Sequence, residues 1–155
     1  MTEEIVTLSA MGYLQADHQR LDVLMGQCLD MIAAGNIAAA AETFGGFRHG
    51  LLRHINIEES LLFPAFESAA GLGSHQGPTA QMRHEHQEIT RLLVLMQDTF
   101  AARRFDEGMF GRLRSQLDNL LRQHNVREER VVYPMTDSLL PADRLEQLVR
   151  QMRSF

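Results

Sequence analysis

The sequence has little of several residue types, and each shortage excludes something. Cys28 is the single cysteine, so an internal disulfide is excluded and a reducing compartment is expected. No apolar run approaches the roughly 18 residues that suggest a membrane span. The net charge of −5 argues against nucleic acid or an anionic membrane as a partner. Val, Ile and Thr are too dispersed to predict any strand.

The length and the placement of Gly and Pro predict one all-α domain. At 155 residues and 45% hydrophobic composition, the chain can bury a sizeable core as a single domain, 1–155. Gly and Pro fall in few places, and the stretches between them have helical periodicity. We expect helices near 9–34, 37–69, 78–103, 106–138 and 141–153, with Asp106 as a candidate N-cap. The acidic N-terminus, Met1–Glu4, is unlike a secretory signal, so a cytoplasmic location is expected.

The most informative feature of the sequence is a motif that occurs twice. His54 is followed by Glu58 after four positions and by Pro64 after ten. The same spacing recurs in the second half of the chain, from His124 to Glu128 and on to a second proline. Residues four apart lie on one face of a helix, so this imidazole and carboxylate can reach one metal or bridge two.

The repeat extends to whole helix faces in alternating steps of three and four, which is how a bundle helix shows its inner face. The first helix gives Met11, Leu14, His18, Leu21, Met25, Cys28 and Ile32, and the third matches it position for position with Thr79, Met82, His86, Ile89, Leu93, Met96 and Phe100. The second gives Phe47, Leu51, His54, Glu58, Leu61 and Ala65, and the fourth matches it with Leu117, Leu121, His124, Glu128, Val131 and Met135. The pattern predicts a duplicated helical hairpin that closes into an antiparallel up-down-up-down four-helix bundle over about 9–138, with a short C-terminal helix over about 141–153.

Polar residues interrupt these apolar faces at one level of the bundle: His18, His54, Glu58, His86, His124 and Glu128. Burying them unpaired would cost roughly 1–3 kcal/mol for each neutral group and more for a carboxylate. Pairing each Glu with a protonated His is one solution, and a metal centre is the solution that satisfies all of them together. The donor count favours two metals, each bound by two nitrogens and sharing both carboxylates, with a water-derived oxo or hydroxo bridge. Such ligands suit Fe, Mn, Zn or Ni.

These residues, with the Glu-Glu and Phe-Pro or Tyr-Pro flanks, resemble the hemerythrin-type HHE cation-binding domain over about residues 9–138. The resemblance implies two iron ions with an oxo or hydroxo bridge, for which zinc or manganese could substitute. It also implies a function in binding or sensing O2 or NO, in the response to cellular iron, or in iron–sulfur cluster repair.

Two positions depart from the oxygen-carrying members of that family. Met82 stands where those proteins have a fifth histidine, and Glu128 stands where they have an aspartate with one more residue of spacing. The fifth histidine leaves one iron open in the carriers. Without it we expect both ions to be accessible, which argues against a reversible oxygen carrier.

Three functions therefore remain open. The first is a di-iron protein that senses or binds O2 or NO. The second is a di-iron enzyme that reduces NO or peroxide, or an iron donor for cluster repair. The third is a structural zinc-binding bundle. No catalytic residue is evident beyond the ligands, which favours the first, while the redox partner is unknown and a homodimer is possible.

The other polar residues near the motif are predicted to be less central. His84 and His49 are expected on solvent-facing helix surfaces, His75 in a glycine-rich loop, and Cys28 as a small hydrophobe. A further set could accept hydrogen bonds from the ligand imidazoles or simply lie on the surface, and both interpretations stay open: Asp17, Glu59, Glu85 and Glu129.

The aromatic-proline pairs after each motif are expected at the end of the bundle. Pro64 and Pro134 should bend or fray their helices, because each lacks a backbone donor. Phe63 and Tyr133 should cap the metal cavity, and the tyrosine hydroxyl could line a path inward.

Overall fold

The computed structural model describes residues 9–74 and 76–155, and every regular element in them is helical. His75 and the acidic N-terminus lie outside the described residues. The order of elements is α2 (Ala10–Ala33), α3 (Ile37–Ile57), η1 (Glu58–Leu62), α4 (Phe63–Ala70), α5 (Pro78–Ala101), α6 (Glu107–Arg127), η2 (Glu128–Val132), α7 (Tyr133–Leu139) and α8 (Ala142–Arg153). The elements η1 and η2 are single π-helical turns.

Side-chain caps and glycines set the ends of the long helices. Ser9 accepts a hydrogen bond from the Gly12 N–H at 2.8 Å, and Asp106 accepts one from the Met109 N–H at 3.0 Å. The prediction that Asp106 caps its helix is therefore confirmed. Gly71, at the end of α4, has a φ of 69°, in the left-handed region that glycine adopts without strain.

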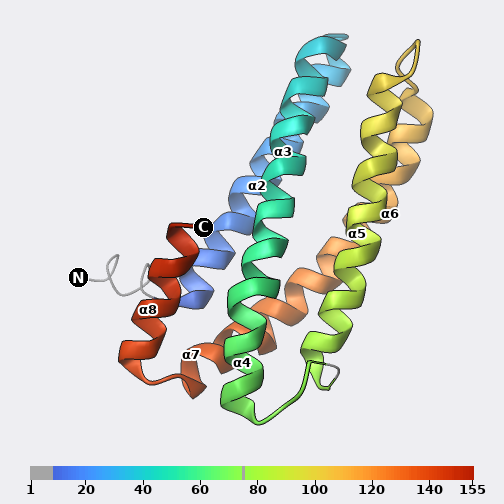
Figure 1. Ribbon diagram of the computed structural model, residues 1–155. Helices are drawn as coiled ribbons and strands as arrows, with labels where there is room; N and C mark the ends of the chain where they lie inside the picture. Colours follow the sequence, from blue (N-terminus) through green and yellow to red (C-terminus); the bar gives the residue numbers. More distant parts are fainter. Residues whose placement is uncertain (1–8, 75) are drawn as a thin grey trace.

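The helices pair as two antiparallel hairpins, α2 with α3 and α5 with α6 (Figure 1). The hairpins join through α3 against α5, and at the other end α7 packs against α2 and α4. This arrangement confirms the predicted all-α antiparallel bundle with an additional C-terminal helix. No helix in the described part of the chain is long and apolar enough to cross a membrane.

The buried side chains form two apolar clusters with a polar layer between them. The larger cluster includes Leu21, Leu51 and Ile89, and the smaller one includes Leu14 and Met82. Along α2 the sequence order is Leu14, His18, Leu21, so the histidine lies between the two clusters. The other three histidines of the repeated pattern, His54, His86 and His124, occupy equivalent places on their helices. The polar layer is thus enclosed from both ends of the bundle.

The predicted inward faces are wrong for the residues that follow Glu58 and Glu128, where the two π-turns lie. Leu61 and Ala65 were predicted to face inward, but Leu62 and Phe66 are the fully buried residues, with exposed fractions of 0% and 1%. In the second copy, Val131 and Met135 are 40% and 42% exposed, whereas Val132 and Thr136 are fully buried. The inward face is shifted by one residue in both copies.

The cause of the shift is the extra residue in each π-turn. The Phe63 N–H donates to the carbonyl of Glu58, five residues back, instead of four. Pro64 lacks an N–H, and in a regular helix its ring would press on the carbonyl of Ser60. Widening the turn accommodates the proline without ending the helix, so the predicted fraying does not occur. The same bond, from Tyr133 to Glu128, forms in the second copy.

The last helix, α8, covers the end of the bundle. Its apolar stripe, Leu148, Val149 and Met152, is buried, and α8 contacts α2 and η1. The Met152 carbonyl accepts hydrogen bonds from Arg53 at 3.2 Å and from the Tyr13 hydroxyl at 3.3 Å. The apolar stripe is therefore covered within the chain itself.

Candidate metal centre

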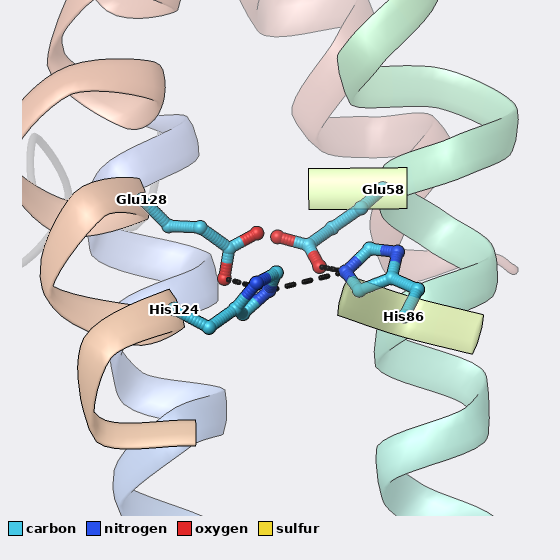
Figure 2. A group of neighbouring side chains, drawn as sticks. All are labelled: Glu58, His86, His124 and Glu128. Atoms are coloured by element: carbon cyan, nitrogen blue, oxygen red, sulfur yellow. Dashed lines mark hydrogen bonds and ion pairs between the residues drawn. The ribbon is translucent and has the colours of Figure 1, made fainter. Parts of the chain in front are cut away.

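The structure brings together the side chains that the sequence singled out. Figure 2 shows Glu58, His86, His124 and Glu128 pointing toward one another from α5, α6 and the starts of the two π-turns. The Nε2 atom of His86 lies 3.1 Å from Nε2 of His124 and 3.2 Å from Oε1 of Glu58. The Nε2 atom of His124 lies 3.1 Å from Oε1 of Glu128. Donor atoms bound to one ion at about 2.0–2.2 Å would be about 3 Å apart, so this spacing fits a single cation.

A second group of donors adjoins the first. The Nε2 atom of His18 lies 3.4 Å from Oε1 of Glu128, and Nε2 of His54 lies 3.6 Å from Oε2 of Glu58. Donor atoms of His18, His54 and Glu128 lie within 4.8 Å of one another, so Glu128 belongs to both groups. Two cation positions that share carboxylates are the arrangement expected of a dinuclear site.

Each histidine has a carboxylate on its outer nitrogen, Nδ1, supplied by a neighbouring helix. Asp17 lies 2.8 Å from His54, Glu85 lies 3.1 Å from His124, Glu59 lies 3.3 Å from His86, and Glu129 lies 3.4 Å from His18. A carboxylate at Nδ1 holds a proton there and turns the Nε2 lone pair toward the centre. For Asp17, Glu59 and Glu85 the structure thus favours the hydrogen-bonding interpretation over a purely surface one. Glu129 lies within ion-pair distance of His18 Nδ1, but that nitrogen has no hydrogen-bond partner.

The two copies of this arrangement correspond. Asp17 directly precedes His18 on α2 and faces His54 on α3. In the same way, Glu85 directly precedes His86 on α5 and faces His124 on α6. Glu59 follows the motif residue Glu58 and faces His86 of the other hairpin. Glu129 follows Glu128 and faces His18 of the first hairpin. Glu85 also pairs with Arg127, whereas in the first hairpin Ile57 stands at that position and Asp17 pairs with Arg20 instead.

The pKa shifts in the metal-free protein indicate that the buried carboxylates of this layer stabilise positive charge beside them. Burial would lower the pKa of His54, but Glu58 and Asp17 raise it to about 10. Burial has the same tendency at His86, where Glu58 and Glu59 raise the pKa to about 9. Burial would raise the pKa of Glu58, yet the charge of His54 holds it well below its usual range. In the metal-free protein, protonated imidazoles thus supply the positive charge that balances the buried carboxylates.

Protons alone leave part of the layer unsatisfied. Among the described residues, Oε1 of Glu58 and Oε2 of Glu128 are buried without a hydrogen-bond partner. The contact from Glu58 Oε1 to His86 at 3.2 Å is close enough for an ion pair but lacks hydrogen-bond geometry. A buried carboxylate oxygen without a partner is costly, and a bound cation would satisfy it. The residues present therefore fit a dinuclear cation site better than His–Glu pairing alone.

The remaining residues singled out in the sequence lie away from the layer. His49 and His84 are exposed, as predicted. Cys28 is fully buried, and burial raises the pKa of its thiol to about 11, which agrees with the prediction of a small hydrophobe. Met82 is 1% exposed and packs in the smaller apolar cluster.

The tyrosine hydroxyl lies deeper than the sequence indicated. Tyr133 is fully buried, and its oxygen lies 3.3 Å from Nε2 of both His18 and His54. It also lies 2.7 Å from Oε2 of Glu58 and 3.0 Å from Oε1 of Glu128. The sequence predicted a cap with a hydroxyl that could line a path inward, because in a regular helix a residue five positions after Glu128 lies on another face than Glu128. The π-turn brings it back.

A groove on the surface extends to His18. It has a volume of about 410 Å³, lies between α2 and α6, and has His18 and Glu129 in its wall. His18 is 6% exposed, whereas His54, His86 and His124 are at most 2% exposed. The polar layer is therefore nearest to solvent at His18.

The fold and this layer define a class: antiparallel helical bundles with a buried His–carboxylate site for two cations. Within that class the chain belongs to the hemerythrin HHE cation-binding domain family, whose sequence profile matches residues 10–136. No curated protein and no solved structure gives a match to the chain.

Proposed function

We propose that the chain binds two iron ions and uses them to bind or sense a small diatomic ligand, O2 or NO. The observation that carries the proposal is a dinuclear donor set that is almost completely closed. The proposed ligands, His18, His54, Glu58, His86, His124 and Glu128, are between 0% and 6% exposed. A reactant that reaches such a layer must be small.

The donors support iron as the metal. Nitrogen and carboxylate oxygen suit iron, and no thiolate lies in the layer, since Cys28, the single cysteine, packs in the larger apolar cluster. The family resemblance also implies a di-iron centre. When bound, ferrous ions with an open position supply the site at which O2 or NO binds.

The residues of the chain contribute orientation and closure. Asp17, Glu59 and Glu85 hold His54, His86 and His124 with Nε2 inward, and Glu129 lies 3.4 Å from Nδ1 of His18. The apolar clusters on both sides exclude water and larger molecules. Among the described residues, the acid or base groups in contact with the proposed ligands are Tyr133 and the four carboxylates on the outer nitrogens, and the carboxylates face away from the centre, which favours binding or sensing over turnover.

The test is metal analysis followed by ligand addition. The purified chain is loaded with ferrous iron, the iron per chain is counted, and O2 or NO is added after anaerobic reduction. We expect two irons per chain and optical bands that reverse when the gas is removed. Glu58→Ala should lose iron and the bands, and His84→Ala should keep both.

Other results would identify another function. Sustained consumption of NO or peroxide with an electron donor would indicate an enzyme, and transfer of iron to a cluster-free acceptor would indicate a repair protein. Zinc with no optical bands would indicate a structural site.

A further inference from the structure

We propose that the phenolic oxygen of Tyr133 is itself a metal ligand, bound to the ion that His18 and His54 hold. This inference rests on the proposed di-iron function and adds a donor outside the His and Glu motif. It makes the two metal positions chemically different.

The first argument is the distance from the tyrosine oxygen to the neighbouring donors. It lies 3.3 Å from each of the two imidazole nitrogens, His18 Nε2 and His54 Nε2. It lies 3.0 Å from Oε1 of Glu128. Adjacent donor atoms that share one ion at about 2.0–2.2 Å are separated by about 2.8–3.6 Å in octahedral or tetrahedral geometry. The hydroxyl thus occupies the place of a ligand.

The second argument is a count of hydrogens. The oxygens of Glu58 and Glu128 that face Tyr133, at 2.7 and 3.0 Å, are both hydrogen-bond acceptors. One phenol supplies a single proton, which cannot serve both oxygens at once. A cation among these atoms turns the same contacts from repulsion into coordination.

The third argument is that the backbone fixes the hydroxyl in place. Tyr133 is the first residue after η2, and its N–H donates to the carbonyl of Glu128. The side chain is fully buried, so its ring cannot turn out to solvent. Phe63 occupies the same position in the first copy, and its ring stacks on His86 at 5.5 Å with an interplanar angle of 12°. Phenylalanine offers no donor, so the ion at His86 and His124 has no equivalent ligand.

Coordination follows a balanced exchange. As the metal binds, the bond between the Tyr133 oxygen and its hydrogen breaks and an oxygen–metal bond forms. The proton leaves to solvent, as protons of metal-binding side chains do. No electron moves in this step, and the oxidation state of the ion is unchanged.

The experiment uses the full chain loaded with iron and oxidised to the ferric state. A phenolate bound to ferric iron gives an intense visible charge-transfer band, and excitation in that band enhances tyrosine ring vibrations in the Raman spectrum. We expect both signals in the wild-type protein, with ring vibrations that shift when the protein is made with ring-deuterated tyrosine. Tyr133→Phe should lose the band and retain iron.

Tyr13→Phe is the matched control, because Tyr13 is the other of the two tyrosines and its hydroxyl bonds to Met152, away from the layer. That variant should keep the band. Two ferric ions per chain without the band, or a band that survives in Tyr133→Phe, would overturn the inference while leaving the di-iron proposal intact. Failure to bind iron at all would overturn both. If Tyr133→Phe does not fold, the isotope shift in the wild-type protein decides the question.

Discussion

The two hairpins of this protein build nearly the same half-site, and their differences show which features the repeat requires. Both place a His-x-x-x-Glu motif before a π-turn, and both hold each imidazole with a carboxylate from a neighbouring helix. They differ five residues after the motif glutamate, where the first hairpin has Phe63 and the second has Tyr133. They differ also in access, because the groove reaches His18 but not His86. In the proposed site the shared features would hold the metals, whereas the unshared ones would distinguish the two ions.

The difference between Phe63 and Tyr133 changes the expected accessibility of the two ions. In the oxygen carriers a fifth histidine closes one ion, and Met82 stands at that position here. The sequence therefore predicted two accessible ions. If Tyr133 coordinates, one ion is closed again, but by the second hairpin and on the side of His18. The two metal positions would then be unequal, as in the oxygen carriers, but because of Tyr133 and not because of a fifth histidine.

The largest effect is expected where the two half-sites share a residue. Glu128→Gln keeps the shape of the side chain but removes the charge that belongs to both donor groups. We expect the iron content to fall from two per chain toward zero. Loss of a metal present at a hundredfold above its Kd removes about 2.7 kcal/mol of stability, or roughly 5–10 °C in Tm for a chain of this size.

Iron analysis and thermal melting measure both effects. Glu146→Gln is the control, because Glu146 pairs with Arg150 on the surface of α8. Full iron content in Glu128→Gln would contradict the shared-ligand arrangement.

The next effect separates the half-sites. His18→Ala and His86→Ala change equivalent positions of the repeat, one in each hairpin. Each should leave about one iron per chain, because each removes a nitrogen from one donor group only. His84→Ala should keep two irons, since His84 is exposed. If His84→Ala halved the iron content, the assignment of the inward face of α5 would be wrong.

A smaller effect is expected from the outer carboxylates. Asp17→Asn and Glu85→Gln weaken the acceptors that hold His54 and His124. Loss of such a partner typically lowers metal affinity about 10–100-fold. Competition with a metal chelator would measure the change. Equal effects in the two variants would show that the half-sites are equivalent in this respect, and no effect in either would show that these contacts do not orient the imidazoles.

The smallest effect concerns pH in the metal-free protein. The pKa of His54 is raised from 6.5 to about 10 and that of His86 to about 9, so the folded state binds these protons more tightly than the unfolded chain. Their contribution to stability is complete below pH 6.5 and is lost as pH rises through 9 to 10. The Tm of the metal-free protein should therefore fall over that range, while the metal-loaded protein should lack this dependence. A Tm of the metal-free protein that rises over this range would contradict the assigned charges.

The sequence predicted the fold and the convergence of the donors because both depend on helical spacing. The positions of His54 and Glu58 on one face follow from four residues of regular helix, and the apolar neighbours identify that face as inward. The carboxylates were harder, since the partner of Asp17 is on another helix and the packing angle decides which imidazole it meets.

The prediction failed beyond each motif glutamate because the helix widens there. Regular spacing assigned Val131 to the interior and predicted Tyr133 as a cap of the metal cavity. The signal was Pro134, whose missing donor and ring disfavour a regular turn. It was interpreted as a bend or fraying of the helix, whereas the chain inserts one residue in the turn and the helix continues. The tyrosine hydroxyl in the metal layer follows from that single bond.

Anomalous diffraction at the iron edge, from crystals of the iron-loaded protein, tests the central claim most directly. The account predicts two peaks about 3.5–4 Å apart, one beside His86 and His124 and one beside His18 and His54, with Glu58 and Glu128 between them. A single peak, or peaks away from these side chains, would contradict it.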